Sequence, residues 1–200
     1  MGFDWLTLIF SLILSYLIGS IPFAYIIAYK KKGVNIWLVG EGNVGARNVW
    51  HVVGPFWGAV TAVLDASKGV AAYLIATHNT GVSPFLFGLT AVLGHQYPLY
   101  LKGKGGKGAA TFMGFLLALY PIPVLLSVFI YFVLVGITKN FHLAISVAMS
   151  SIPLLWFPLF KIPFRESLYT VLFMSILGIK RVIDDRHMKE IKKRGLFWTL

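Results

Sequence analysis

Residues 5–29 read WLTLIFSLILSYLIGSIPFAYIIAY, a run that contains no Asp, Glu, Lys or Arg. A helix needs about 20 mainly apolar residues to cross the hydrocarbon core of a bilayer, so this stretch is long enough to span one. It is too long for the apolar part of a signal peptide, and Asp4 rather than a basic residue precedes it. We therefore expect a retained transmembrane helix here.

The remaining chain has the same apolar character. Of 200 residues, 58% are hydrophobic and only 12% are charged, with a mean hydropathy of +0.78. A soluble domain needs more charge to cover its surface. We predict an all-α integral membrane protein, a single domain over residues 1–200 with about seven spans. The expected spans are Trp5–Tyr29, Gly54–Ala76, Val82–Leu101, Ala109–Tyr120, Ile122–Thr138, Phe141–Phe160 and Ser167–Ile183.

The distribution of Lys and Arg predicts the orientation of these spans. With the N-terminus outside, all 18 basic residues except Lys68, Lys161 and Arg165 fall on the cytoplasmic side, together with the C-terminus. Flipping the chain would reverse this bias. The same placement explains the net charge of +11, so we do not expect a nucleic-acid partner. The chain has no cysteine, which excludes disulfides and thiolate metal ligands.

Residues 101–109 read LKGKGGKGA, a predicted cytoplasmic loop in which lysines alternate with glycines. Glycines let successive backbone N–H groups face one concavity that binds anions, and the next helix begins directly afterwards. The loop is not a Walker A sequence, because Gly108 follows Lys107 where Ser or Thr is required. We interpret it as a phosphate-binding loop; a flexible loop that only sets topology is the alternative.

Residues 40–48 read GEGNVGARN and form a second glycine-rich cytoplasmic loop. The amides of Asn43 and Asn48 can bind hydroxyl or phosphate groups, and Arg47 can pair with a phosphate through two hydrogen bonds. A turn-rich segment with left-handed asparagines is an equally good interpretation of this loop.

Three further polar residues lie within or at the end of predicted spans. Asp65 and Lys68 are three apart and share one helix face, where they form either a functional pair or a structural ion pair. His95 ends the third span and suits a general base or a hydrogen-bond donor. We find no carboxylate cluster or HExxH pattern that predicts a metal site.

Five motifs follow one another between Gly19 and about Thr111. They are Gly19-Ser20-Ile21-Pro22, Gly42-Asn43-Val44-Gly45-Ala46-x-Asn48, Asp65-x-x-Lys68-Gly69, Gly94-His95-x-Tyr97-Pro98 and Lys104-Gly105-Gly106-Lys107-Gly108. In this order they resemble the bacterial acyl-phosphate:glycerol-3-phosphate acyltransferases, the PlsY family. The resemblance implies a multi-pass enzyme of the bacterial inner membrane with its active site facing the cytoplasm.

The implied reaction transfers an acyl chain from acyl phosphate to the sn-1 hydroxyl of glycerol 3-phosphate, giving lysophosphatidate and phosphate without a cofactor. It also implies an association with the enzyme that produces acyl phosphate. The expected catalytic residues are His95, Lys104 and Asn43. The expected substrate-binding residues are Ser20, Gly42, Arg47, Asn48, Asp65, Lys68, Gly105, Gly106, Lys107 and Gly108. The general base is either His95 or a substrate phosphate oxygen.

The chain departs from the family pattern at several positions. The family usually has serine where Glu41 stands and arginine where His51 stands, and Arg47 is a candidate replacement for that arginine. A serine pair near the sixth span is replaced around His142, and the usual Arg-His-Arg-Glu-Asn-Ile tail reads IKRVID at residues 179–184. These changes raise the alternative of a diverged paralogue with another acceptor or no activity.

Two other classes of function compete with the enzyme. A transporter or binding protein for a phosphorylated small molecule would also explain charged residues inside a span. Against it, the sequence has no evident inverted repeat, and its unusual residues gather on one side of the membrane. A non-catalytic partner in a lipid-synthesis complex is the third class.

Overall fold

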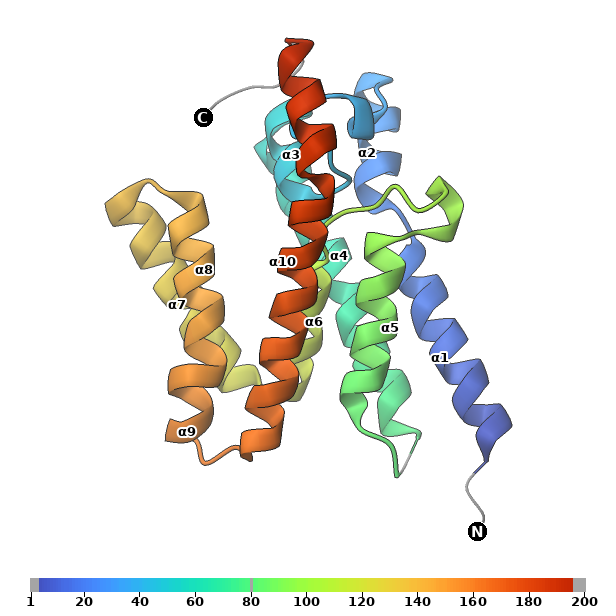
Figure 1. The fold of residues 1–200 in the computed structure, drawn as a ribbon, viewed down its shortest axis with the longest axis vertical. Coiled ribbons are helices and arrows are strands. Elements are labelled where there is room, and N and C mark those ends of the chain that lie inside the picture. Colours follow the sequence, from blue (N-terminus) through green and yellow to red (C-terminus); the bar gives the residue numbers. More distant parts are fainter. Residues whose placement is uncertain (1–3, 80, 196–200) are drawn as a thin grey trace. The chain divides into compact units, whose positions relative to one another are not determined.

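The computed structural model describes residues 4–79 and 81–195, and all regular structure in these residues is helical (Figure 1). The helices are α1 (Trp5–Ser20), α2 (Phe23–Lys32), α3 (Ala46–Val52), α4 (Pro55–Thr77), α5 (Pro84–Gln96), α6 (Ala109–Leu119), α7 (Pro121–Thr138), α8 (Phe141–Ser151), α9 (Phe157–Leu159) and α10 (Phe164–Lys193). Short 3-10 turns at Ile36–Leu38 and Leu99–Leu101 precede the two glycine-rich loops. The predicted all-α class is confirmed.

Four helical segments are long and apolar enough to cross a membrane. They are Trp5–Lys32, Pro55–Thr77, Pro121–Thr138 and Phe141–Leu159. The apolar helix α6 is shorter, and α5 has 13 residues, which gives a length of about 20 Å at 1.5 Å per residue. Each of the seven expected segments therefore has a helix in the structure, but length and composition alone support four of them as spans.

The first expected span is not one continuous helix. α1 ends at Ser20, Ile21 is extended with φ −59° and ψ 115°, and α2 begins at Phe23. Pro22 has no N–H to continue the helical ladder, and its ring disfavours helical geometry in the residue before it. The prediction of a single helix over Trp5–Tyr29 was wrong at this point.

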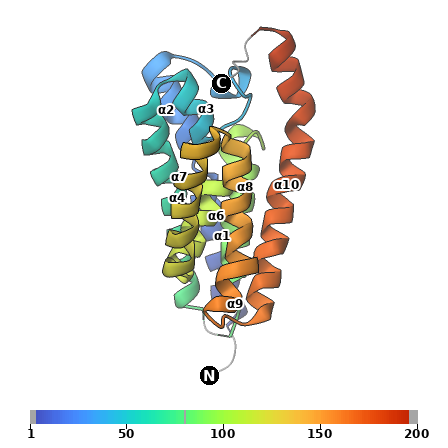
Figure 2. The same ribbon diagram turned by 90° about the vertical axis from the view of Figure 1, so that its left-hand side faces the viewer.

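The chain divides into two compact units, residues 1–115 with 177–200 and residues 116–176. Because the boundaries fall inside α6 and α10, both helices contribute to each unit. The expected single domain over residues 1–200 stays a prediction. In the first unit, α5 packs against α1 and α4, and α3 packs against α4 (Figures 1 and 2).

Glycines let the helices of the first unit approach to backbone contact. A Cβ atom at Gly19 of α1 would overlap the Ala91 carbonyl of α5, and one at Gly69 of α4 would overlap the Thr111 carbonyl of α6. Lipid provides no hydrophobic force between helices, so close van der Waals packing of small residues takes that role. These contacts bring the polar ends of α1, α4, α5 and α6 together.

A separate apolar cluster supports the first glycine-rich loop. Ala24, Ile27 and Ala28 of α2 are buried against Val49 of α3 and Val44 of the loop. The loop is therefore anchored on both sides by buried hydrophobic residues, and its polar residues are held in place.

The second unit contains a π-helical turn at Ile152–Trp156 between α8 and α9. Pro153 lies in this turn and has no N–H, which interrupts the α-helical ladder. Nearby hydroxyl groups are paired: Ser127 and Ser151 lie 3.0 Å apart, and Ser167 donates to the Pro153 carbonyl at 3.3 Å.

We predict that Gly19→Ala destabilises the protein by about 1–3 kcal/mol, because the added methyl group would force α1 away from α5. Thermal unfolding in detergent, followed by tryptophan fluorescence, measures the effect. Gly136→Ala in α7 is the matched control, since a Cβ there would meet nothing within 4 Å. Equal melting temperatures for the two variants would contradict the close α1–α5 contact.

Candidate active site

The first glycine-rich loop has a fixed backbone. Gly40 and Gly42 have φ values of 62° and 60°, in the left-handed region that favours glycine. They turn the chain on either side of Glu41. The local sequence Gly-Glu-Gly therefore determines where the Glu41 side chain leaves the loop.

Asn48 holds this loop together from inside. Its side chain is fully buried, and its oxygen accepts the Glu41 N–H at 2.9 Å. Its amide nitrogen donates to the carbonyls of Ile36, Val39 and Asn43 at 2.9, 3.0 and 2.9 Å. Both amide hydrogens are thus used within the protein. The side chain braces the loop in this geometry and presents no N–H to a ligand, whereas a contact with substrate was expected from the motif.

The second glycine-rich loop packs tightly on the end of α5. A Cβ at Gly105 would overlap the His95 carbonyl, and one at Gly106 would overlap the His95 ring and the Val44 carbonyl. The Gly106 N–H donates to the His95 carbonyl at 3.1 Å, so it does not face an anion as a cradle of successive N–H groups would require. Position 106 requires glycine because its backbone lies close to His95 and Val44. The same close packing brings the two loops into contact.

Charged side chains join the two loops. A carboxylate oxygen of Glu41 lies 2.6 Å from Nη1 of Arg47, and the other lies 4.0 Å from Nζ of Lys107. The Glu41 side chain is 8% exposed, whereas those of Arg47 and Lys107 are each 23% exposed. The two cations can therefore reach solutes while the carboxylate lies beneath them.

Burial lowers the pKa of Lys107, and the charges of Arg181 and Arg47 act in the same direction, while Glu41 and Asp184 oppose them. Burial also lowers the pKa of His51, as does Arg47, and Glu41 opposes this shift. Lys107 therefore loses its charge at a lower pH than an ordinary lysine.

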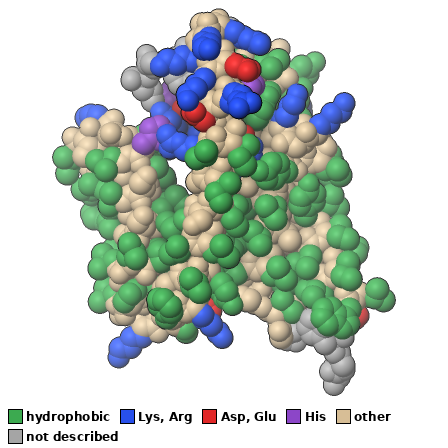
Figure 3. Space-filling view, in the orientation of Figure 1, with side chains coloured by type: hydrophobic (Ala, Val, Ile, Leu, Met, Phe, Trp, Pro, Cys, Tyr) green, Lys and Arg blue, Asp and Glu red, His purple; other side chains and the backbone are tan. Residues whose placement is uncertain are grey.

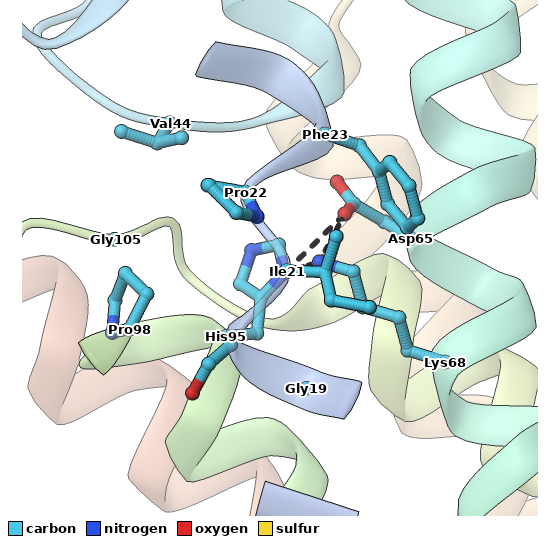
Figure 4. A pocket seen from close by; sticks show the side chains of 11 residues that line it. Gly19, Ile21, Pro22, Phe23, Val44, Asp65, Lys68, His95, Pro98 and Gly105 are labelled. Atoms are coloured by element: carbon cyan, nitrogen blue, oxygen red, sulfur yellow. Dashed lines mark hydrogen bonds and ion pairs between the residues drawn. The ribbon is translucent and has the colours of Figure 1, made fainter. Parts of the chain in front are cut away.

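A second charged group lies deeper, between α4 and α5 (Figure 4). Nζ of Lys68 lies 2.7 Å from the Asp65 carboxylate, and both side chains are 2% exposed. Nδ1 of His95 lies 3.4 Å from Nζ of Lys68, 3.6 Å from the carboxylate and 3.3 Å from the Thr111 hydroxyl. The three residues that sequence analysis selected from two separate spans thus form one buried cluster.

A small cavity borders this cluster. Its walls include the broken segment between α1 and α2, where Ser20, Ile21 and Pro22 lie, and both glycine-rich loops contribute through Val44 and Gly105. Its volume of about 10 Å³ is close to the space of a single water molecule. Ser20 is buried and donates to the Tyr16 carbonyl at 2.9 Å.

The other expected residues differ in accessibility. Asn43 is 5% exposed, and its side-chain oxygen is buried without a hydrogen-bond partner among the described residues. This acceptor can receive a hydrogen bond from a ligand. Lys104 is exposed, in contrast to Lys107 on the same loop. His142 belongs to the second compact unit.

α10 contributes side chains that were not among the expected site residues. Lys180 and Asp184 form a buried ion pair at 2.6 Å, with Nζ of Lys180 5.0 Å from the Tyr97 ring centre. The His187 ring stacks on Trp37 at 4.3 Å, and its Nε2 lies 2.9 Å from the Trp37 carbonyl oxygen. In the sequence, Lys180 and Asp184 are opposite charges four residues apart at the end of an apolar segment, a pattern that could have pointed to a buried ion pair.

The accessible surface separates charge from apolar side chains. Figure 3 shows Lys and Arg gathered over the C-terminal end of α10, where Arg186, Lys189, Lys192, Lys193 and Arg194 are exposed. Hydrophobic side chains cover much of the flanks in the same view. In residues 4–79 and 81–195, no group of three His, Asp or Glu side chains is arranged to hold a metal ion.

The sequence also matches known proteins. The sequence model of the glycerol-3-phosphate acyltransferases matches residues 9–194. The chain belongs to the glycerol-3-phosphate acyltransferase family.

Two curated family members are similar over nearly their whole length. The glycerol-3-phosphate acyltransferase of Desulforamulus reducens is 37% identical over 85% of this chain and 86% of the relative. That of Desulforudis audaxviator is 36% identical over 92% of this chain and 93% of the relative. The crystal structure of PlsY, an integral membrane glycerol 3-phosphate acyltransferase, in its glycerol 3-phosphate form has a TM-score of 0.79 at 32% identity, covering 91% of this chain and 92% of PlsY.

We predict that binding of inorganic phosphate weakens as the pH rises and that the loss is already evident below about 10.4, the ordinary pKa of lysine, because the lowered pKa of Lys107 makes it lose its positive charge earlier than an ordinary lysine. Phosphate itself stays a dianion there. Lys107→Arg keeps its charge and should flatten the pH profile. Identical profiles for the wild type and Lys107→Arg would show that Lys107 does not bind the anion.

Proposed function

We propose that this glycerol-3-phosphate acyltransferase transfers an acyl chain from acyl phosphate to the sn-1 hydroxyl of glycerol 3-phosphate. The observation that carries the proposal is the pair of partly exposed cations, Arg47 and Lys107, which the two contacting loops place around one position. Both substrates carry a phosphate, so the reaction needs positive charge from more than one direction. Guanidinium and ammonium groups provide it.

The reaction needs little covalent help from the protein. The hydroxyl oxygen of glycerol 3-phosphate attacks the carbonyl carbon of acyl phosphate, an ester C–O bond forms, and the C–O bond to phosphate breaks. The hydroxyl proton leaves to a base, and inorganic phosphate carries away the bonding electrons. Positioning the substrates and stabilising the developing negative charge are the enzyme's main tasks.

His95 suits hydrogen-bond donation better than proton abstraction. The Lys68 ammonium lies 3.4 Å from its Nδ1, closer than the Asp65 carboxylate at 3.6 Å, and an ammonium has hydrogens to donate and no lone pair. A neutral ring that accepts at Nδ1 carries its proton on Nε2, the atom that lies against the Gly106 backbone. We therefore assign His95 to donating a hydrogen bond, with Asp65 holding Lys68, and a substrate phosphate oxygen to accepting the hydroxyl proton.

The remaining roles follow from accessibility. We assign Lys107, with Gly105 and Gly108, to binding acyl phosphate. The Lys104 side chain is exposed, so we assign it to attracting anions from solution. The free buried oxygen of Asn43 suits a glycerol hydroxyl. Asn48 positions the loop, Ser20 lines the cavity, and Gly42 allows the turn beside Arg47.

We further propose seven spans, with the N-terminus outside, the C-terminus in the cytoplasm and the active site at the cytoplasmic face of a bacterial inner membrane. The distribution of basic residues supports this orientation. The exposed basic residues on α10 would face the cytoplasm and suit association with a soluble enzyme that produces acyl phosphate. The assay below also tests for transport of a phosphorylated molecule, the alternative that charged residues inside a span raised.

We predict that purified protein converts palmitoyl phosphate and labelled glycerol 3-phosphate to labelled lysophosphatidate, and that Lys107→Ala lowers kcat/KM by about a hundredfold through loss of a charge-assisted contact. Lys104→Ala should cost less than tenfold, and exposed Lys32→Ala should have no effect. Folded protein that forms no product, but takes up labelled glycerol 3-phosphate into vesicles, would favour a transporter.

Topology is testable because the chain has no native cysteine. We predict that Lys32→Cys is labelled by a membrane-impermeant maleimide only after the inner membrane is opened, whereas Lys161→Cys is labelled in intact spheroplasts. Both residues are exposed, so the comparison is matched in accessibility. The reverse pattern would contradict the N-out orientation.

A further inference from the structure

Glu41 occupies the position where the two loops present their cations. Its carboxylate contacts Arg47 at 2.6 Å with one oxygen and Lys107 at 4.0 Å with the other. Arg47 comes from the first loop and Lys107 from the second, 60 residues apart in sequence number. A buried carboxylate at this point is costly unless it is paired, and here both oxygens are directed at cations.

This arrangement imitates a bound phosphate. A phosphate held between Arg47 and Lys107 would direct one oxygen at each cation, as the Glu41 carboxylate does. The backbone adds to the resemblance, because Glu41 is held between two left-handed glycines and its N–H is bonded to Asn48. The side chain therefore starts from a fixed point next to the cations.

We propose that Glu41 is an internal counter-ion which a substrate phosphate must displace from Arg47 and Lys107, and that it thereby sets the affinity of the site for phosphate. The inference rests on the proposed function in taking a phosphate ester as the ligand. Glu41 thus determines specificity without taking part in bond formation.

The two contacts of Glu41 are unequal, and this indicates how exchange occurs. The pair with Arg47 is short, whereas the contact with Lys107 is at the limit of an ion pair. Lys107 is therefore the cation that turns to an incoming phosphate most easily. Arg181 and Asp184 of α10 also act on Lys107, but Asp184 is paired with Lys180 at 2.6 Å. Among the residues that the structure describes, Glu41 provides the carboxylate within 4.0 Å of Nζ of Lys107.

A purely structural role for Glu41 predicts the opposite result. If the carboxylate only held the loops together, its removal would separate Arg47 from Lys107 and weaken phosphate binding. If it competes with phosphate, its removal takes a negative charge away from both cations and strengthens binding. The direction of the change therefore decides between the two roles.

The experiment measures binding of inorganic phosphate by calorimetry, using protein in nanodiscs of uncharged lipid. We expect Glu41→Gln to bind phosphate about tenfold more tightly than the wild type, because a like charge a few ångströms away has been removed. Asp185→Asn is the matched control: it removes the same charge from a half-exposed position paired with exposed Lys189, and should leave phosphate binding unchanged.

Unchanged or weaker phosphate binding by folded Glu41→Gln would overturn the inference. If this variant does not fold, Glu41→Ser provides the same test, with the same expected direction. Acyl transfer is assayed separately with palmitoyl phosphate. If Glu41→Gln binds phosphate more tightly but the wild type transfers no acyl chain, the role of Glu41 stands and the proposed function is rejected. If the wild type transfers normally but Glu41→Gln binds phosphate no more tightly, the proposed function stands and the role of Glu41 is rejected.

Discussion

Backbone contact between helices is the constraint on which the first unit depends. α1 meets α5 at Gly19, and α4 meets α6 at Gly69, in both cases with no room for a Cβ atom. Because lipid does not drive helices together by the hydrophobic effect, such contacts have to provide the packing energy. They also determine the chemistry, since the same pairs of helices carry the Asp65–Lys68–His95 cluster and the cavity beside it.

The buried carboxylates of this unit are held in close ion pairs. Lys68 is paired with Asp65, Lys180 with Asp184, and Arg47 with Glu41, each within 2.7 Å. Removing one partner from a buried pair is expensive, so these pairs restrict how the loops and helices can rearrange. Arg47 and Lys107 are partly exposed, whereas Lys68 and Lys180 are buried. The site thus combines a rigid, paired interior with an outer edge at which anions can exchange.

Several residues that the sequence analysis selected have different physical roles in the structure. Gly106 was interpreted as part of an N–H cradle, but its N–H is bonded to the His95 carbonyl and its missing side chain makes room for His95 and Val44. Asn48 was expected to contact substrate, and in the structure its amide hydrogens brace the first loop. A motif identifies which residues matter, but the same residue type can serve packing, bracing or ligand binding.

The amino-acid sequence by itself determined the helical class, the family and the approximate position of a helix in each of the seven expected segments, but it did not predict α3 at Ala46–Val52. Long apolar segments leave the backbone no partners except its own, which makes helices the outcome, and ordered short motifs are specific to a family. The partners of the charged residues were decided by tertiary structure alone. Glu41 meets Lys107 because Gly106 packs against His95 and the first loop, and His187 reaches the loop because α10 extends to Lys193, ten residues past the predicted end at Ile183. Such contacts depend on distances between segments that are far apart in sequence, so they cannot be predicted from local composition.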